Sequence, residues 1–248
     1  MPPERLPESL SAVLPAFNEE AVIATTVRRV HDVMASLGLD SHELLVVDDG
    51  SRDGTRAACE TVARELPDVR VISHQMNRGY GAALRTGFEA ARGSAIFLMD
   101  SDGQFDPTEL RRLLELWGGN TVVCGYRARR NDPAARRAYN RAFFTIVNAR
   151  VGRTARDINC GFKLFPRAVG TGLTSDGALI STELLVRARD RGCTIIDVPV
   201  SHAPRLTGSS TGANPRVVLR AFGELWERDR RLRRERTQNA TALDATLR

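Results

Sequence analysis

The residues best suited to chemistry lie directly after an apolar run at residues 95–99, where Asp100 and Asp102 are followed by Gln104. Apolar side chains fill both faces of this run, which is typical of a buried parallel strand. In open α/β sheets, ligands bind just beyond the carboxyl ends of such strands. Two neighbouring carboxylates repel unless a cation lies between them, and Mg²⁺ takes carboxylates together with phosphate oxygens. The spacing favours a divalent-metal and diphosphate site, although a turn that only caps the next helix fits the same residues.

A second predicted strand, at residues 43–47, carries an apolar run at 44–47 and also ends in a pair of aspartates, of which Asp48 is the first. We predict that both runs are parallel strands of one sheet. The carboxyl ends of parallel strands lie at the same edge, so Asp48 is expected to face the same crevice as Asp100.

Helix starts are predicted beside these acidic residues. Asn18 is expected to cap a helix with Glu19 in its first turn, where the helix dipole favours negative charge. For Glu19, this capping role and a contact with a ligand both stay open. Ser51 or Asp53 is expected to cap the helix that follows Asp48.

The elements that position these residues alternate regularly between strand and helix. Strands are predicted at residues 9–14, 43–47, 69–73, 95–99 and 121–125, with a further strand at 193–200. This alternation predicts an α/β fold with a mostly parallel central sheet flanked by helices.

The rhythm changes after residue 125. Eight arginines lie between residues 127 and 153, around an apolar stripe at helical spacing. A basic amphipathic helix of this kind can lie on a membrane surface or cover a phosphate-bearing acceptor, and a solvated helix packed on the core produces the same pattern.

Composition limits the class of protein. The chain has 248 residues, a net charge of +6 and a pI near 9.7, which favours an anionic partner. No apolar run approaches the roughly 20 residues that cross a bilayer, and the first residues do not resemble a secretory signal, so a cytoplasmic location is expected. The four cysteines are widely spaced, which predicts buried small residues and neither a zinc site nor a disulfide framework.

The order and placement of these motifs resemble the family 2 inverting glycosyltransferases of the GT-A fold. Within that family, the chain is most similar to the dolichol-phosphate mannose synthases, or polyprenol-phosphate sugar transferases. The resemblance covers residues 9–225 and is carried by VLPAFNE at 13–19, VVDDGSRDGT at 46–55, NRGYG at 77–81, DSDGQ at 100–104, GFK at 161–163 and VPV at 198–200.

This resemblance implies that the chain binds a nucleotide-sugar. The residues that would bind its nucleoside are Pro15, Phe17, Glu19, Val46 and Asp48. Those that would hold Mg²⁺ or Mn²⁺ on the diphosphate are Asp100, Asp102 and Gln104, with Ser101 as a further substrate contact. Metal bound by Asp100 and Asp102 would stabilise the charge that develops on the leaving nucleoside diphosphate.

Asp157 and Lys163 are candidates for the acceptor side, Arg127 is a further candidate substrate contact, and Arg205 would meet phosphate charge. A polyprenyl phosphate is already anionic near neutral pH, so its attack needs no strong general base. A neutral hydroxyl acceptor needs one, and Asp157 is the candidate.

We therefore expect a metal-dependent transferase that moves a hexose from GDP-mannose or a UDP-sugar to a polyprenyl phosphate at the cytosolic membrane face. The same chemistry on a soluble small molecule or a protein stays open, as does a homodimer. A nucleic-acid or membrane-surface binding module is less favoured, because the arginines form no recognisable nucleic-acid motif, and nucleic acid is not expected as a partner. The expected divisions are a flexible N-terminus at 1–8, a single catalytic domain at 9–225 with nucleotide-sugar and acceptor halves meeting after residue 125, and a basic tail at 226–248.

Overall fold

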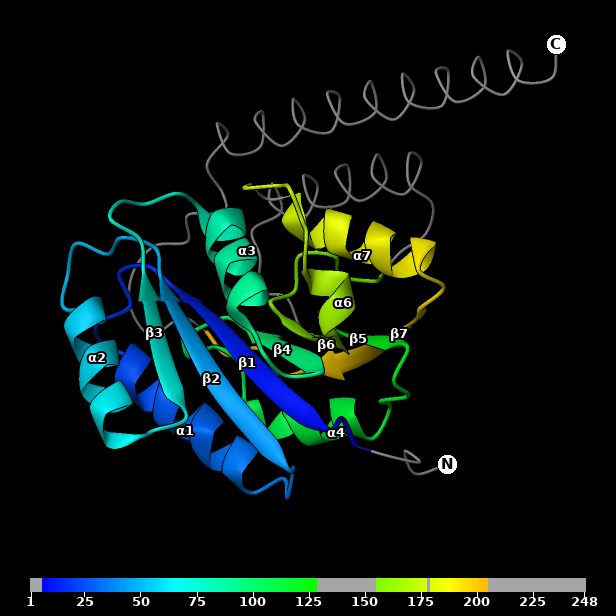
Figure 1. The fold of residues 1–248 in the computed structure, drawn as a ribbon, viewed down its shortest axis with the longest axis horizontal. Helices are drawn as coiled ribbons and strands as arrows, with labels where there is room; N and C mark the ends of the chain where they lie inside the picture. The colour runs from blue at the N-terminus through cyan, green and yellow to red at the C-terminus, as the bar shows by residue number, and fades with distance from the viewer. Residues whose placement is uncertain (1–5, 129–154, 178, 205–248) are drawn as a thin grey trace, which may run out of the picture.

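The computed structural model describes residues 6–128, 155–177 and 179–204. Seven strands of this part of the chain form one sheet in the order β3-β2-β1-β4-β6-β5-β7 (Figure 1). The strands are β1 (Ser9–Ala16), β2 (Ser41–Asp48), β3 (Val69–Ser73), β4 (Ala95–Met99), β5 (Thr121–Arg127), β6 (Phe162–Pro166) and β7 (Thr194–Val200). The helices are α1 (Ile23–Ala35), α2 (Thr55–Glu65), α3 (Tyr80–Ala90), the 3₁₀ turn η1 (Pro107–Glu109), α4 (Leu110–Leu114), α6 (Arg167–Gly170) and α7 (Ile180–Asp190).

The sheet is mostly parallel, which confirms the predicted α/β class. β6 is the exception, because it lies between β4 and β5 and pairs antiparallel with both. This strand is absent from the strands predicted from the sequence, and its apolar run has no alternation that would indicate its direction.

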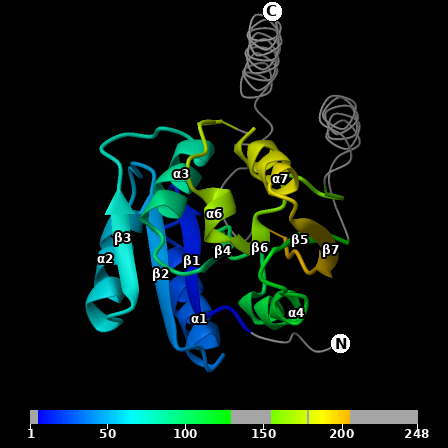
Figure 2. The same ribbon diagram turned by 45° about the vertical axis from the view of Figure 1, so that its right-hand side comes forward.

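Helices cover both faces of the sheet, which Figures 1 and 2 show from two directions. Successive side chains of a strand point to opposite faces. Leu10, Ala12 and Leu14 of β1 accordingly pack with residues of α1, α2 and α4, whereas Val13 packs with residues of α3, α6 and α7. The two apolar clusters fix the strands, and the strands fix the loops at their carboxyl ends.

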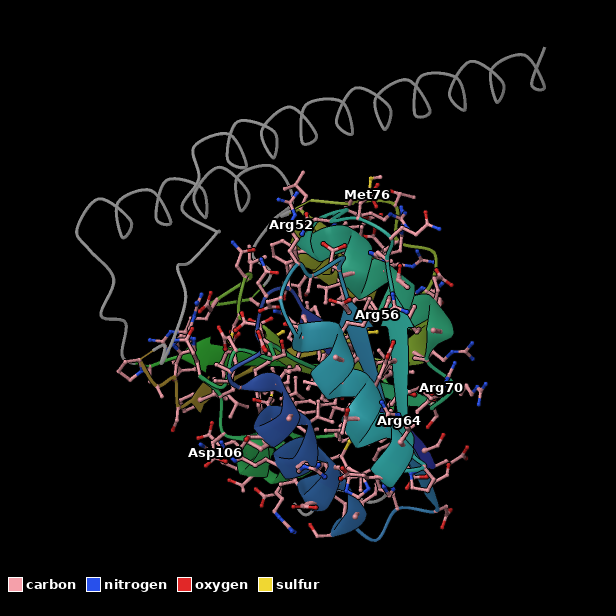
Figure 3. All side chains as sticks on the ribbon, turned by 90° about the vertical axis from the view of Figure 1, so that its left-hand side faces the viewer. Arg52, Arg56, Arg64, Arg70, Met76 and Asp106 are labelled. Carbon is pink, nitrogen blue, oxygen red and sulfur yellow. The ribbon has the colours of Figure 1, made fainter. Side chains whose placement is uncertain are left out.

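One edge of the sheet is β3, seen in Figure 3 with Arg56 and Arg64 on α2 and Arg70 on β3. Charged side chains on an edge strand disfavour pairing with another chain. Arg70 Nη1 also reaches back to Glu43 Oε2 on β2, at 2.7 Å.

Glu43 is the centre of a polar cluster at this edge. Besides Arg70, it accepts hydrogen bonds from Ser11 Oγ at 2.7 Å and from the Arg92 backbone N–H at 2.6 Å. Burial alone would raise the pKa of Glu43, but these hydrogen bonds lower it below its usual value. The ionised carboxylate therefore holds the start of β4 against β1 and β2.

The described residues contain no helix that is both long and apolar enough to cross a membrane. The arginine-rich stretch at 129–154, residue Arg205 and the basic tail at 226–248 lie outside the described residues, so the predictions made for them are not tested.

Candidate active site

The carboxyl ends of β1, β2 and β4 lie at one edge of the sheet, because β1 pairs parallel with both β2 and β4. The strand register places Ala16 of β1 beside Asp48 of β2, and Asp100 directly follows β4. Because β1 lies between β2 and β4, the backbones that carry Asp48 and Asp100 are about 10 Å apart. The topology therefore brings the acidic ends of two separate strands to one edge.

Asp100 is partly buried and tightly held. Its Oδ1 accepts a hydrogen bond from the Tyr80 hydroxyl at 2.8 Å, and its backbone N–H donates to the Gly161 carbonyl at 2.9 Å. Burial and the negative charge of Asp102 raise the pKa of Asp100 to about 6, against the opposing effects of Tyr80 and Lys163. This carboxylate is ionised at neutral pH only at a cost that a neighbouring cation would remove.

Gly161 allows β6 to approach that carboxylate. A Cβ at this position would lie 2.1 Å from Asp100 Cγ, well inside van der Waals contact. Any other residue would displace either the strand or the Asp100 side chain, so glycine is required here for space.

The Asp-Ser-Asp-Gly turn does not cap the next helix. Asp102 Oδ1 accepts from the Gln104 backbone N–H at 3.1 Å, within the turn itself. Asp106 is the residue that caps η1, through a hydrogen bond from the Thr108 N–H at 3.1 Å. The hydrogen bonds of this turn therefore do not explain the two carboxylates as a helix cap.

Ser101 and Gln104 join the turn to other strands. Ser101 is buried, and its hydroxyl donates to the Pro15 carbonyl at 2.6 Å, which fixes β4 to β1. Gln104 Nε2 donates to the Ala203 carbonyl at 2.6 Å, and the Ala203 N–H donates to the Gln104 carbonyl at 2.8 Å. The segment after β7 is thereby held against the acidic turn, and the Gln104 amide oxygen is the part of its side chain suited to bind a metal.

The oxygen atoms of Asp100, Asp102 and Gln104 are suitable ligands for a divalent cation. Asp100 and Asp102 each have one oxygen in a hydrogen bond, and both side chains keep partial exposure. Carboxylate and amide oxygens are the ligands that Mg²⁺ and Mn²⁺ prefer. The repulsion that raises the pKa of Asp100 is what a shared cation would offset.

The loop after β1 differs from its prediction. α1 begins at Ile23 with Val22 as its N-cap and no capping side chain, so the prediction that Asn18 caps this helix is wrong. Asn18 instead has a φ of 56° and accepts a hydrogen bond from the Arg52 N–H at 2.9 Å. A pattern confined to neighbouring residues cannot reveal this contact with the loop after β2.

Glu19 is buried at the same loop, and it lies outside the first turn of α1. Its backbone N–H donates to Thr55 Oγ1 at 2.8 Å. The N-cap of α2 is Gly54, so the prediction that Ser51 or Asp53 occupies this position is wrong. Asp53 instead accepts from the Thr55 N–H at 3.1 Å, at the first residue of α2.

The remaining residues expected at the nucleoside differ in exposure. Phe17 is partly exposed, whereas Pro15 is buried and Val46 is fully buried in the core. Asp48 is buried as well, and its Oδ1 accepts from the Ser51 N–H at 3.1 Å. Of these, Phe17 has the exposure that direct side-chain contact with a ligand requires.

Asp49, which was assigned no role, organises the loop before α3. It accepts hydrogen bonds from the N–H groups of Arg78 at 2.9 Å and Gly79 at 2.8 Å, and contacts His74 Nδ1 at 2.7 Å. This loop leads into Tyr80, the hydrogen-bond donor to Asp100. Asp49 is therefore a structural neighbour of the candidate site.

Arg127 and Asp157, which the sequence suggests as substrate-binding and acceptor-side residues, form a bidentate ion pair. Arg127 Nε lies 2.9 Å from Asp157 Oδ2, and Arg127 Nη2 lies 3.2 Å from Asp157 Oδ1. Burial opposes the charge on Arg127, but the hydrogen bonds and charge of Asp157 raise its pKa above the usual value. Both oxygens of Asp157 accept from this guanidinium, which favours a positioning role over that of a general base.

Lys163 is almost completely buried, with 1% of its surface exposed, and its ammonium donates to the Cys160 carbonyl. Its charge lowers the pKa of Asp100, so it acts on the acidic turn through the protein interior. The four cysteines are free, and burial raises the pKa of Cys59, Cys124 and Cys160 to about 12.

Two residues that contact Asp100 are not among the site residues predicted from the sequence. Tyr80 and Gly161 both lie in motifs that carried the family resemblance, but their contacts with Asp100 join segments 20 and 61 residues apart. The signal available in the sequence was the motif itself, and only the fold reveals the shared partner.

The chain is similar in sequence to known glycosyltransferases. Residues 11–179 match the family described as glycosyl transferase family 2. Undecaprenyl-phosphate 4-deoxy-4-formamido-L-arabinose transferase from Pseudomonas aeruginosa is 32% identical over 216 residues, which cover 86% of this chain and 63% of the relative. Glycosyltransferase AglD from Haloferax volcanii is 31% identical over 79% of this chain and 33% of its own length. The chain thus spans less than two thirds of these relatives.

Solved structures share the fold. Glucosyl-3-phosphoglycerate synthase from Mycobacterium tuberculosis, in complex with Mn²⁺ and UDP-glucose, superposes with a TM-score of 0.66 at 22% identity, covering 89% of this chain and 78% of that one. Mannosyltransferase PcManGT from Pyrobaculum calidifontis, in complex with GDP-Man and Mn²⁺, gives a TM-score of 0.59 at 19% identity, covering 86% and 61%. The architecture is therefore the GT-A fold.

Proposed function

We propose that this chain, which belongs to glycosyl transferase family 2, transfers a sugar from a nucleotide-sugar to a polyprenyl phosphate. The observation that carries the proposal is the pair of carboxylates Asp100 and Asp102 at the carboxyl end of β4, where the charge of Asp102 raises the pKa of Asp100. Only β1 separates this pair from Asp48 at the end of β2. The names of the relatives supply the acceptor class, undecaprenyl phosphate. We further propose that residues 9–225 form the catalytic domain and that it works at the cytosolic membrane face.

The donor is proposed to bind along the ends of β1 and β2. Phe17 is placed to contact the nucleoside, while Asp48 and Glu19 shape the loops around it. The buried positions of Pro15 and Val46 allow backbone contact with the nucleoside and no side-chain contact.

Asp100, Asp102 and the Gln104 amide oxygen are proposed to hold Mg²⁺ or Mn²⁺ against the diphosphate. When bound, this ion neutralises negative charge on the departing nucleoside diphosphate. The chain's own part is to fix the ligands: Tyr80 orients Asp100, the turn orients Asp102, and Ala203 orients Gln104. Ligands held in this way need no reorganisation during the reaction.

The acceptor is proposed to approach from the side of β5 and β6. Arg127, fixed by Asp157, presents positive charge at the end of β5, near enough to Asp100 to affect its pKa. Arg205 is proposed to add charge to the acceptor phosphate. Lys163 is proposed to act through Asp100, because its ammonium is buried. An anionic acceptor oxygen needs positioning more than deprotonation, which suits a site whose Asp157 is already paired.

The test is transfer of labelled sugar from GDP-mannose, UDP-glucose or UDP-GlcNAc to undecaprenyl phosphate in detergent, with and without Mn²⁺. The expected product is a metal-dependent, organic-extractable labelled lipid. Asp102→Asn should lower its formation by at least about 100-fold, in line with the loss of charge stabilisation in other enzymes. Asp106→Asn is the matched control, because this carboxylate caps η1 and should leave transfer intact.

Transfer to 3-phosphoglycerate or another soluble acceptor, with none to the lipid, would refute the proposed lipid acceptor and leave the proposed glycosyltransferase activity standing. Failure with every donor and acceptor, together with no Mn²⁺-dependent stabilisation by any donor, would refute the proposed function. A ligand that binds only the folded state must raise its stability, so the second measurement does not depend on the acceptor.

A further inference from the structure

A second group of metal-binding side chains lies at the end of the sheet opposite Asp100. His31 is on α1, His42 is near the start of β2, and Asp68 precedes β3; one ligand atom from each lies within 4.8 Å of the others. Figure 1 shows the end of α1 and the starts of β2 and β3 together at the lower edge of the view. His42 and Asp48 are six residues apart on β2, about 20 Å, so this group is separate from the candidate active site.

One nitrogen of this group has no hydrogen bond to any residue that the structure describes. His42 Nε2 is buried and has no hydrogen-bond partner among the residues that the structure describes. Its neighbour Asp68 Oδ2 is 3.7 Å away, which is too far for a hydrogen bond. Buried imidazole nitrogens are normally satisfied, so this atom points to a ligand beyond the protein's own donors and acceptors.

The surrounding structure holds the backbone segments that carry these three side chains close together. The Leu44 N–H donates to the Asp68 carbonyl at 2.9 Å, which fixes the turn before β3 against β2. The rings of His31 and His42 meet edge to face at a centroid distance of 6.2 Å, so they are not stacked. Asp32 Oδ1 lies 3.5 Å from His31 Nδ1, where a carboxylate can orient the ring.

We propose that His31, His42 and Asp68 bind Zn²⁺, with water as the fourth ligand. Two imidazoles and one carboxylate suit Zn²⁺, whereas Mg²⁺ and Mn²⁺ prefer oxygen sets such as Asp100 and Asp102. Tetrahedral Zn²⁺ places such ligand atoms about 3.3 Å apart, so the most widely separated pair must close by at most about 1.5 Å. Asp68 Oδ2 already lies 3.7 Å from His42 Nε2, and the Asp68 side chain is 50% exposed, so it has room to move toward the two rings. The ion would tie α1 to β2 and β3 without contact with the substrate.

The experiment uses the full chain, freed of metal by chelation and titrated with ZnCl₂ by calorimetry and thermal unfolding. Co²⁺ serves as a second probe, because four-coordinate Co²⁺ absorbs visible light strongly and reports ligand geometry. We expect Zn²⁺ binding and a rise in Tm, both retained in Asp102→Asn. Asp68→Asn should weaken binding by at least about tenfold and remove the Co²⁺ absorption. Asp40→Asn is the matched control, because this exposed carboxylate is two residues from His42 and is not a ligand.

The proposal is independent of transferase activity. His42→Gln should weaken Zn²⁺ binding as Asp68→Asn does. If His42→Gln does not fold, Asp68→Asn still tests the proposal, because the Asp68 side chain is partly exposed and its substitution disturbs the core least. Unchanged Zn²⁺ binding in Asp68→Asn would overturn the proposal. So would loss of binding in Asp102→Asn alone, because Zn²⁺ would then occupy the acidic turn.

Discussion

Replacement of Gly161 by alanine tests whether the position of Asp100 determines metal binding. The added Cβ would lie 2.1 Å from both Asp100 Cγ and Oδ2. Contacts between such atoms are normally at least about 3.4 Å, so the carboxylate must move by about 1.3 Å. Gly161 is not among the residues with positive φ, so alanine adopts its backbone conformation, and the simplest relief is rotation of the Asp100 side chain.

This displacement removes Asp100 from Tyr80 and from the geometry that it shares with Asp102. Displaced or badly oriented ligands cost about 10- to 100-fold in metal affinity, and an error of about 1 Å in a reacting group costs about 100-fold in rate. We therefore expect Gly161→Ala to bind Mn²⁺ at least about tenfold more weakly, measured by calorimetry or by the EPR signal of free Mn²⁺. Thermal unfolding should change little.

Gly192→Ala is the control with the opposite expectation. Gly192 has a φ of 72° and nothing within 4 Å of an added Cβ, so alanine is strained there but meets no neighbour. It should lower the free energy of unfolding by about 1–2 kcal/mol and leave Mn²⁺ affinity unchanged. If folded Gly161→Ala bound Mn²⁺ as tightly as the parent protein, the assignment of Asp100 as a metal ligand would be refuted.

Three further predictions concern stability and thiol reactivity. Because the folded-state pKa of Glu43 is lowered, the ionised carboxylate stabilises the fold above the usual pKa of 4.5, and this stabilisation is lost as pH falls. In denaturant titrations, Glu43→Gln should lower the free energy of unfolding by about 1.5–3 kcal/mol at pH 7 and by progressively less below pH 4. A loss that does not depend on pH would contradict this. Asp157→Asn and Arg127→Lys should each lower the free energy of unfolding. A double-mutant cycle should give a coupling energy of about 0.5–3 kcal/mol between the two side chains. Additive effects would show that the interaction between them contributes nothing to stability. A thiol reagent should label Cys193 in the native protein and the other cysteines only after unfolding; rapid labelling of a buried cysteine would contradict the packing.

Much of the fold could be predicted from local patterns. Apolar runs of strand length separated by helical segments predict the parallel sheet, and the turn at Asp100–Asp102 was located at its carboxyl edge from this pattern alone. Strand direction was not accessible for β6, because a buried strand is apolar on both faces whichever way it runs. The pairing of β6 with both β4 and β5 depends on the whole sheet.

The sequence predicts the charged residues of the candidate site better than it predicts the residues whose hydrogen bonds and packing position them. Asp48 and Asp100 end apolar runs, which is a local signal. Asn18 looked like a helix cap because asparagine often precedes a helix, yet its side chain binds the Arg52 N–H of another loop. Contacts of this kind join distant segments, as do those of Tyr80 and Gly161 with Asp100, and spacing along the chain carries no record of them.

The reversed direction of β6 makes both halves of the chain necessary for the acidic turn. Because β6 runs antiparallel to β4, Phe162 at its start pairs with Met99 at the end of β4. The residues just before β6 therefore reach the carboxyl edge of the sheet, where Gly161 binds the Asp100 N–H and Asp157 holds Arg127 at the end of β5. A parallel strand in this place would bring its other end, near Pro166, to Asp100. The direction of one strand thus places the positive charge proposed for the acceptor beside the carboxylates proposed for the donor's metal.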